Sequence, residues 1–235
     1  MNIVITGGSR GLGKAIAEKF ASDKQGHTIL LCARNAESLE SAAIDLQSRF
    51  PRTTIKWLVC DMSVKENVIQ FGSWVLEQVD KVDVLVNNTG IFIPGSVHNE
   101  PDGALEEMIA ANLYSAYHLT RCIVPSMMQL KSGHIFNMCS IASLKAYHNG
   151  GAYSISKYAL AGFSHNLREE MKHYGVKVTG IYPGAVYTRS WEGSGVDPHR
   201  IMTEKDIADM VYASTFLSPQ ACVEDIIIRP QLGDL

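Results

Sequence analysis

The segment Thr6-Gly7-Gly8-Ser9-Arg10-Gly11-Leu12-Gly13 decides the fold. It follows an apolar run over residues 2–6 and opens a stretch in which Leu12, Ile16 and Phe20 recur every fourth residue. This change of period indicates a strand, a tight turn and an amphipathic helix. Glycine suits the turn because the chain bends sharply and its backbone must approach a pyrophosphate closely. The spacing TGxxxGxG differs from the general GxGxxG fingerprint, and a bare turn is the alternative, but the position between strand and helix favours nucleotide binding.

The rest of the chain alternates short apolar runs with longer stretches of helical period. Seven strands are expected, over residues 2–6, 27–33, 54–60, 82–87, 133–139, 176–182 and 224–229. Most of these runs are continuously apolar, as strands covered on both faces should be. The pattern predicts an α/β fold of the Rossmann type, a doubly wound and mostly parallel seven-stranded sheet with helices on both faces. We expect residues 1–235 to form a single domain.

Three features of the helices are also predicted. Ile155, Ala159, Phe163, Leu167 and Met171 should form a stripe that lies on the sheet. Ser63 with Glu66, and Thr203 with Asp206, have the spacing of capping boxes at helix starts. Residues 102–130 should form one long helix with an irregular second half, because Pro125 kinks it or ends it early.

Composition and charge limit the class of protein. Hydrophobic residues make up 46% and charged residues 19% of the chain, which is typical of globular proteins and excludes disorder. A net charge of −3 at pH 7 gives no positive field, so we expect no nucleic-acid partner. The chain shows no signal-type leader and no apolar run of membrane-spanning length, which favours a cytoplasmic protein without a membrane contact.

Cysteine and histidine usage gives no sign of a disulfide framework or a metal site. The five cysteines lie far apart without a CxxC pair, and their odd number fits a reducing compartment. Cys139 lies next to Ser140, but a cysteine at a strand end is usually a small apolar filler. The eight histidines lack any ligand spacing, so we expect no metal.

Chemically distinctive residues follow the strands rather than precede them. They lie at residues 6–13, 34, 61, 87–90, 140–143 and 183–188. In an open parallel sheet, every loop that leads from a strand to a helix lies at the carboxyl edge, where ligands bind. The sequence therefore predicts one site at one edge of the sheet.

Arg34 ends the second strand, at the position where many NAD-dependent enzymes carry a carboxylate for the ribose 2′-hydroxyl. A guanidinium there can instead face a 2′-phosphate through charge-assisted hydrogen bonds, and Arg10 in the glycine-rich loop would be a second partner. This pair favours NADP(H) as the cofactor. The alternative is that both are solvated surface arginines.

Tyr153 and Lys157 lie one turn apart on the same face of a helix expected to start near Ala152. Such a pair is ordinary on a surface, but Ser140 adds a hydroxyl at the same edge of the sheet. Together they supply what carbonyl reduction needs, namely a donor to the oxygen, an acid and a stabilising cation. A cation about 4 Å from a phenol lowers its pKa by at most about three units, so Lys157 should bring the pKa of Tyr153 toward neutrality.

In this combination and order the sequence resembles the short-chain dehydrogenase/reductase family. The matching pieces are TGGSRGLG, Asp61, Asn87-Asn88-Thr89-Gly90, Asn112, Ser140, Tyr153-Ser-Ile-Ser-Lys157, and Pro183-Gly184 followed by Thr188. The resemblance implies hydride transfer between the nicotinamide of NADP(H) and a carbonyl or secondary alcohol. Thr89 departs from the family, which commonly shows alanine there. Ser143 is a second hydroxyl near Ser140, but Ser140 has the more family-like separation from Tyr153.

The resemblance also implies roles for individual residues. Tyr153 would be the general acid in reduction and the base in oxidation, Ser140 would orient the substrate oxygen, Lys157 would bond the nicotinamide ribose, and Asn112 would hold a water in a proton relay. The cofactor would contact Gly7, Ser9, Arg10, Gly11, Leu12, Gly13, Arg34, Asp61, Met62, Asn88, Gly90, Tyr153, Lys157, Pro183, Gly184, Val186 and Thr188. Residues 188–202 would form a small mobile substrate lid. Family members commonly pair through the helices over residues 102–130 and 152–174, so a homodimer or homotetramer is expected.

Other functions and the substrate stay open at this point. A non-catalytic NADP(H) sensor or scaffold is possible on the same fold, although it would not need Ser140, Asn112, Tyr153 and Lys157. A methyltransferase would have no use for Arg34 or the YxxxK pair, and a hydrolase would need the GxSxG elbow that the sequence lacks. The side chains Ile91, Phe92, Tyr147, Trp191 and Met202, with His148 as a further candidate, favour an apolar or aromatic small-molecule substrate.

Overall fold

The sheet has the predicted architecture. The computed structural model describes residues 1–188, 191, 193 and 195–234. Seven strands form one sheet in the order β3-β2-β1-β4-β5-β6-β7, and all neighbouring strands run parallel. Their bounds are β1 Asn2–Thr6, β2 Thr28–Ala33, β3 Thr54–Val59, β4 Val84–Asn87, β5 Gly133–Met138, β6 Val176–Pro183 and β7 Asp225–Ile228. Each strand lies within two residues of its predicted bounds, which confirms the doubly wound α/β fold.

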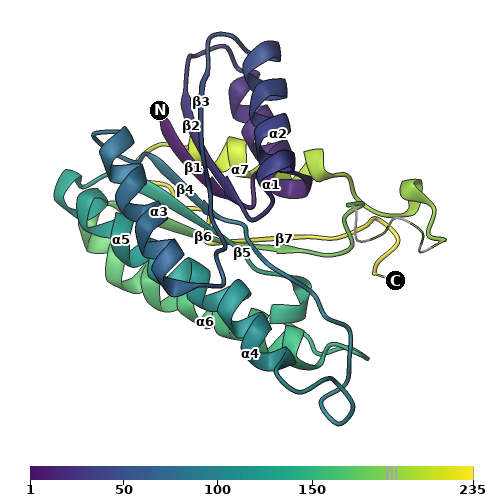
Figure 1. The fold of residues 1–235 in the computed structure, drawn as a ribbon. Coiled ribbons are helices and arrows are strands. Elements are labelled where there is room, and N and C mark those ends of the chain that lie inside the picture. The colour runs from purple at the N-terminus through teal and green to yellow at the C-terminus, as the bar shows by residue number, and fades with distance from the viewer. Residues whose placement is uncertain (189–190, 192, 194, 235) are drawn as a thin grey trace.

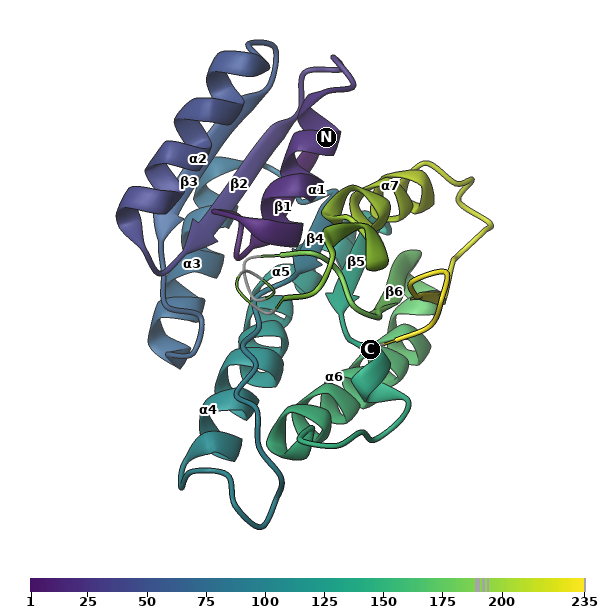
Figure 2. The same ribbon diagram turned by 90° about the vertical axis from the view of Figure 1, so that its right-hand side faces the viewer.

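Helices cover both faces of this sheet (Figures 1 and 2). They are α1 Gly11–Ala21, α2 Ala36–Arg49, α3 Lys65–Gln78, α4 Ala104–Ile109, α5 Ser115–Leu130, α6 Gly151–Met171 and α7 Glu204–Thr215. Ile16, Leu39 and Ile207 bring α1, α2 and α7 into the core on one face. Val68, Leu119 and Leu167 do the same for α3, α5 and α6 on the other face. Burial of these apolar side chains is what holds the two layers to the sheet.

The long helix expected over residues 102–130 is interrupted earlier than predicted. A π-helical turn over Ala110–Tyr114 separates α4 from α5, whereas α5 continues through Pro125 to Leu130. The prediction of an irregular second half is therefore wrong. The irregular turn contains Asn112, whose side-chain amide donates to the carbonyl of Ile91. Single π turns occur frequently at functional sites because they redirect one side chain.

One of the two predicted capping boxes is wrong. Thr203 and Asp206 form the expected box at the start of α7. At α3, however, the Ser63 hydroxyl donates to Asp61 Oδ1 at 2.7 Å, and the N-cap is Val64. Ser63 prefers the carboxylate two residues earlier because a hydrogen bond to a charged acceptor is stronger than one from a neutral backbone amide.

The stripe predicted on α6 is correct only in its last two turns. Leu167 and Met171 are buried, but Ile155 is 45% exposed. Lys157, Leu160 and Ser164 occupy the buried face instead. The apolar pattern misses this face because the face includes a lysine and a serine, which are bonded to the Met138 carbonyl and to the Asn137 amide.

The reversal of strand order at β1 and β4 fixes where ligands can bind. β1 pairs with β2 on one side and β4 on the other, so the loops that follow β1 and β4 leave toward opposite faces of the sheet. Such a switch point opens a crevice at the carboxyl edge. Within the described ranges, no helix has the length and apolarity of a membrane span, and no three or more His, Cys, Asp or Glu side chains gather as a metal site.

Candidate active site

The glycine-rich loop between β1 and α1 has a backbone that only glycine adopts easily. Gly7 and Gly11 have φ angles of 66° and 59°, in the left-handed region. A Cβ on Gly13 would lie 2.4 Å from the carbonyl oxygen of Gly7. The first turn of α1 carries no acidic residue, and its N-cap, Arg10, makes no side-chain hydrogen bond. The N–H groups and positive end of α1 therefore suit an anionic group such as a pyrophosphate.

Thr6 and Asn88 join this loop to the end of β4. The backbone N–H groups of Asn88 and Thr89 both donate to Thr6 Oγ1 at 2.9 Å. Asn88 Nδ2 donates to the Thr6 carbonyl at 2.8 Å. The amide of Asn88 thus braces the crevice, while its predicted contact with the cofactor stays a prediction. This role of the Thr6 hydroxyl was not predicted, because in the sequence Thr6 marks only the point where strand and loop meet.

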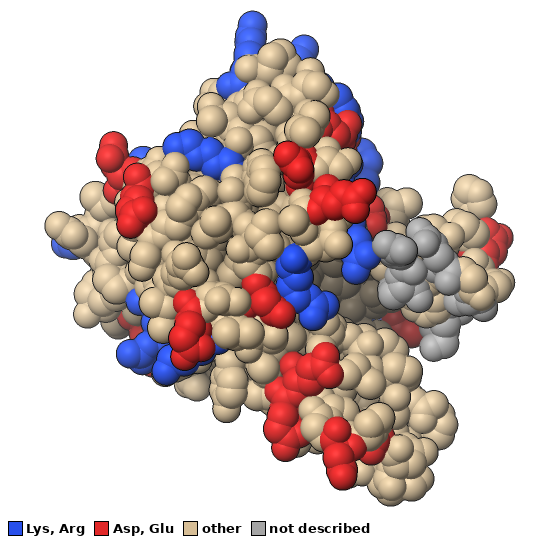
Figure 3. All heavy atoms as spheres, in the orientation of Figure 1, with Lys and Arg blue, Asp and Glu red and all other residues tan. Residues whose placement is uncertain are grey.

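Two exposed arginines lie at the rim of the crevice. Arg34 directly follows β2 and Arg10 precedes α1, and neither forms an ion pair within the described residues. Burial raises the pKa of Asp61, but hydrogen bonds from Ser63 and the charge of Arg34 outweigh it, so this pKa lies below its usual value. The side chain of Met62 is buried, so only its backbone could meet a ligand. In the space-filling view a hollow opens near the middle of the face, with Lys and Arg side chains beside it (Figure 3).

Ser140 and Tyr153 form a hydroxyl pair at the end of β5. The Ser140 hydroxyl lies close enough to the phenol of Tyr153 to lower the pKa of that phenol, and it accepts from the N–H of Ala142 at 3.1 Å. Ser143 is buried, and its hydroxyl accepts from the backbone N–H of Ser140 at 3.2 Å. Ser143 therefore supports the turn that presents Ser140, which favours Ser140 as the hydroxyl that meets a substrate.

Lys157 is a buried cation that the backbone of β5 holds. Its Nζ donates to the carbonyl of Met138 at 2.7 Å and lies 5.8 Å from the centre of the Tyr153 ring. Burial lowers the pKa of Lys157 to about 8. Burial also raises the pKa of Tyr153, and Ser140 only partly offsets this. The expectation that Lys157 draws the pKa of Tyr153 toward neutrality is not met, because burial dominates and raises this pKa.

Asn112 and Gly90 lie beside Lys157 in the candidate site. Asn112 Oδ1 accepts from the N–H of Ile91 at 2.7 Å, and its Nδ2 donates to the Ser156 hydroxyl at 2.8 Å. A Cβ on Gly90 would lie 3.1 Å from Asn112 Oδ1 and 3.3 Å from Lys157 Nζ. Gly90 thus keeps open the space in front of both polar groups. Ser156, which sequence analysis did not single out, fixes the orientation of the Asn112 amide.

The end of β6 places Pro183, Gly184, Val186 and Thr188 at the same edge. The N–H of Gly184 donates to the Ile228 carbonyl at 2.8 Å, and the buried side chain of Val186 packs in the core. Backbone hydrogen bonds of 2.8 and 3.1 Å join Tyr187 and Ala185 to Met202, so the two ends of the predicted lid meet. The side chain of Met202 is largely buried and packs in the core. Arg189, Ser190, Glu192 and Ser194 of that segment lie outside the described residues.

Half-exposed aromatic side chains flank the phenol of Tyr153. The ring of Phe92 meets the ring of Tyr153 edge to face, with centroids 4.9 Å apart, and is 48% exposed. Tyr147 is 46% exposed. Burial, together with the neighbouring Tyr153, raises the pKa of Tyr147 to about 12. Phe92 and Tyr147 thus form an aromatic and uncharged wall on this side of the phenol at neutral pH.

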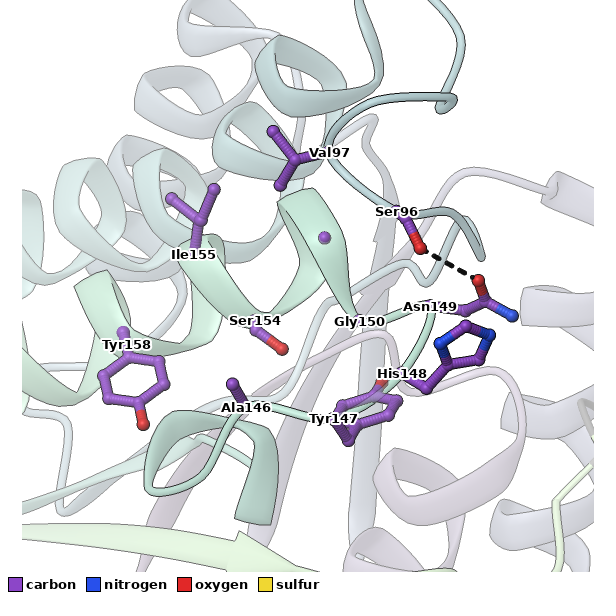
Figure 4. Close-up of a pocket in the computed structure, with 11 residues that line it drawn as sticks. Ser96, Val97, Ala146, Tyr147, His148, Asn149, Gly150, Ser154, Ile155 and Tyr158 are labelled. Atoms are coloured by element: carbon purple, nitrogen blue, oxygen red, sulfur yellow. Dashed lines mark hydrogen bonds between the residues drawn. The ribbon is translucent and has the colours of Figure 1, made fainter.

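A cavity of about 530 Å³ lies against the first turns of α6 (Figure 4). Val97, Ile155 and Tyr158 contribute apolar walls, and the hydroxyl of Ser154 is buried there without a hydrogen-bond partner among the described residues. Its described lining includes neither Ser140 nor Tyr153. The lining does include Tyr147, so the cavity adjoins the aromatic side chains beside the Tyr153 phenol.

Known proteins match the chain over almost its whole length. The family model described as short chain dehydrogenase matches residues 1–197. Sepiapterin reductase of Chlorobaculum tepidum is 30% identical over 240 residues, which cover 99% of this chain and 97% of the reductase.

Solved structures agree with the family match. A metagenomic short-chain oxidoreductase in complex with NADP is 30% identical with a TM-score of 0.84, covering 98% of this chain and 97% of its own. An alcohol dehydrogenase from the archaeon Thermococcus sibiricus, complexed with 5-hydroxy-NADP, is 28% identical with a TM-score of 0.89, covering 98% and 96%. The family model matches most of the chain, and the relatives cover nearly all of it. The chain therefore belongs to the short-chain dehydrogenase family of oxidoreductases.

Proposed function

We propose that this protein is an NADP(H)-dependent oxidoreductase that transfers a hydride between the nicotinamide and a carbonyl or secondary alcohol, with Tyr153 as general acid and base. The observation that carries the proposal is that Ser140, Tyr153 and Lys157 lie together at the sheet edge that also carries the glycine-rich loop, with Lys157 Nζ 5.8 Å from the centre of the Tyr153 ring. The NADP complexes of the two structural relatives support the choice of cofactor.

The crevice fits a dinucleotide with a 2′-phosphate. The positive end of α1 would hold the pyrophosphate against Gly7, Ser9, Gly11, Leu12 and Gly13. Arg34 and Arg10 would hold the 2′-phosphate, Asp61 and Met62 would border the adenine, and Asn88 would border its ribose. The room that Gly90 leaves in front of Lys157 would admit the nicotinamide ribose, with Pro183, Gly184, Val186 and Thr188 on the opposite side. Bound NADPH would supply the hydride.

The protein side chains would supply the proton and the charge stabilisation. Because burial raises its pKa, the phenol of Tyr153 holds its proton at neutral pH, which is the form that reduction requires. Ser140 would donate a hydrogen bond to the substrate oxygen as negative charge develops there. Below pH 8 the Lys157 side chain stays protonated. Its positive charge would stabilise the tyrosinate that forms when Tyr153 gives up its proton. Asn112 would hold a water that returns a proton through Lys157.

The substrate class that these surroundings favour is an apolar or aromatic carbonyl compound. Phe92 and Tyr147 are half-exposed beside the phenol and carry no charge at neutral pH. Ile91 and Trp191 would extend this wall. A flat ring beside the carbonyl would gain contact with Phe92, whereas a charged substrate would lose hydration without a partner.

We also propose a cytoplasmic homodimer or homotetramer. Tyr114 in the π turn, Tyr117 on α5, and Ile155 and Tyr158 on α6 leave apolar surface exposed. The five cysteines are free thiols. Apolar surface of this kind favours association of copies. Light scattering is expected to report a dimer or tetramer, and a monomer at micromolar concentration would contradict the proposal.

A non-catalytic sensor of NADP(H) is the competing function, and one experiment separates the two. Consumption of NADPH and of NADH would be measured with a panel of ketones, diketones, quinones and ketoacyl thioesters. The proposal expects turnover with at least one carbonyl and a clear preference for NADPH. Binding of NADPH without turnover on any member of the panel would favour the sensor, and a preference for NADH would remove the role assigned to Arg34.

A further inference from the structure

We propose that Glu100 is a positioning residue of this enzyme, whose carboxylate fastens the loop over residues 91–103 to the N-terminus of α6 and thereby fixes Tyr153. The inference rests on the proposed function, because it assigns Glu100 a part in the reaction that Tyr153 carries out. Glu100 lies in the connection between β4 and α4, far from the YxxxK pair in sequence.

The start of α6 needs a partner from elsewhere in the chain. This helix has 21 residues, but its N-cap is Gly150, no side chain of the cap bonds its amides, and its first turn contains no acidic residue. The first N–H groups of a helix require an acceptor, and a carboxylate also complements the positive end of the dipole. Glu100 Oε2 meets this need by accepting from the N–H of Ala152 at 3.0 Å. Tyr153 is the next residue.

Gly151 makes this contact possible. A Cβ at that position would lie 2.4 Å from Glu100 Oε2 and 2.7 Å from the carbonyl oxygen of Gly95. The carboxylate therefore lies directly against the backbone of the first turn. A side chain at position 151 would push the loop away from the helix that carries Tyr153.

Further hydrogen bonds tie the same loop to the segment before α6. The N–H of Gly95 donates to the Asn149 carbonyl at 3.2 Å, and the Ser96 hydroxyl donates to Asn149 Oδ1 at 3.1 Å (Figure 4). Asn149 adopts a left-handed φ of 57°, which is uncommon for a residue with a side chain. The N–H of Glu100 donates to the Ser96 carbonyl at 2.9 Å, so these bonds and the carboxylate belong to one turn.

The other end of the loop is fixed by Asn112, which bonds both backbone groups of Ile91. Between the two fixed ends, Phe92 contacts the ring of Tyr153. Glu100 thus acts on Tyr153 in two ways, through the first turn of α6 and through the loop that carries Phe92. Its loss would leave Ala152 N–H without a protein acceptor and free one end of the Phe92 loop.

The test compares Glu100→Ala, Glu100→Gln and a matched control, Asp206→Ala. Asp206 accepts from the N–H of Thr203 at the start of α7, so its loss removes a helix cap of the same chemical kind away from Tyr153. Glutamine keeps an oxygen acceptor for Ala152. The measurements are kcat and KM with a carbonyl substrate, the Kd of NADPH, Tm, and backbone hydrogen exchange in peptides that cover residues 147–156.

Glu100→Ala is expected to lower kcat about tenfold or more, because small displacements of a reacting group cost large factors in rate. The Kd of NADPH should stay within about twofold, since no phosphate-binding group moves. Exchange of residues 147–156 should rise. Glu100→Gln should restore most of kcat, and Asp206→Ala should lower Tm while kcat stays near the wild-type value.

An unchanged kcat in Glu100→Ala, or a Glu100→Gln enzyme as slow as Glu100→Ala, would overturn the role assigned to this hydrogen bond. An equal loss of kcat in Asp206→Ala would do the same, because the effect would then be one of stability alone. Hydrogen exchange separates this inference from the proposed function. If the wild-type protein turns over no carbonyl, the proposed function fails, whereas unchanged exchange in Glu100→Ala refutes the contact itself.

Discussion

The two ends of the candidate site are built in opposite ways. At the catalytic end, Ser140, Lys157 and Asn112 are 9%, 4% and 1% exposed, and each polar group is bonded to a neighbouring backbone or hydroxyl group. At the phosphate end, Arg10 and Arg34 are exposed, and neither forms an ion pair within the described residues. Buried polar groups must be paired because desolvation is costly, whereas solvated guanidinium groups need no partner.

This difference determines what substitutions at each end should do. The proposed catalytic groups are held in place by bonds within the protein, so their loss should lower the rate while cofactor affinity stays. The arginines are proposed to act only when a phosphate binds, so their loss should lower affinity without affecting folding. Rate and affinity should therefore separate between the two ends.

The largest effect is expected at the phenol. Tyr153→Phe should lower kcat about a thousandfold, because it removes the general acid, while the Kd of NADPH stays within about twofold. Steady-state kinetics and fluorescence titration with NADPH measure the two quantities. Tyr158→Phe on the exposed side of the same helix is the control and should behave as the wild type. Turnover retained in Tyr153→Phe would eliminate this residue as the acid.

The next largest effect is expected at Ser140. Ser140→Ala should lower kcat about a hundredfold, because one donor to the developing oxyanion is lost. Ser143→Ala should act mainly on Tm, since its hydroxyl accepts from the backbone of Ser140. Kinetics and thermal unfolding of both variants decide between the two serines. If Ser143→Ala proved the slower enzyme, the assignment would have to be exchanged.

A smaller and opposite pattern is expected at the rim. Arg34→Leu should raise the KM for NADPH about 10- to 100-fold, as expected for loss of a charge-assisted hydrogen bond. The KM for NADH and Tm should change little, because the guanidinium is exposed. Arg52→Leu, at an exposed arginine between α2 and β3, is the matched control. Equal losses with both cofactors would show that Arg34 does not read the 2′-phosphate.

The smallest effect concerns stability and pH. Without cofactor, the folded protein releases the Lys157 proton at a pKa of about 8, whereas an unfolded lysine keeps it to about pH 10.4. The unfolded state therefore binds more protons between these values, and wild-type stability should rise with pH there. Lys157→Met lacks this gain. The Tm of the wild type minus that of Lys157→Met should increase by a few degrees from pH 7 to pH 10, and a decrease would contradict the burial of a charged ammonium.

Much of the site could be predicted because its residues follow local patterns. Strand ends are visible in the apolar runs, and parallel strands bring their ends to one edge, so the amino-acid sequence alone groups Arg34, Ser140 and Tyr153. The glycines at positions 7, 11 and 13 indicate a turn that side chains would block.

The remainder depends on contacts between distant segments. Glu100 and Ala152 are 52 positions apart, and no spacing indicates their hydrogen bond. The π turn at Asn112 exists because of its bonds to Ile91 and Ser156, which a helical period cannot show. The raised pKa of Tyr153 follows mainly from burial, which is a property of the packed core.

Deuterium transfer tests the central claim most directly. The wild-type protein would be incubated with NADPH deuterated at either face of C4 and with a carbonyl that it consumes, and the product would be examined by mass spectrometry and NMR. Deuterium from one face is expected to arrive on the carbinol carbon, and Tyr153→Phe should abolish this transfer while NADPH still binds. Binding of NADPH with no deuterium in any product would refute hydride transfer by this protein.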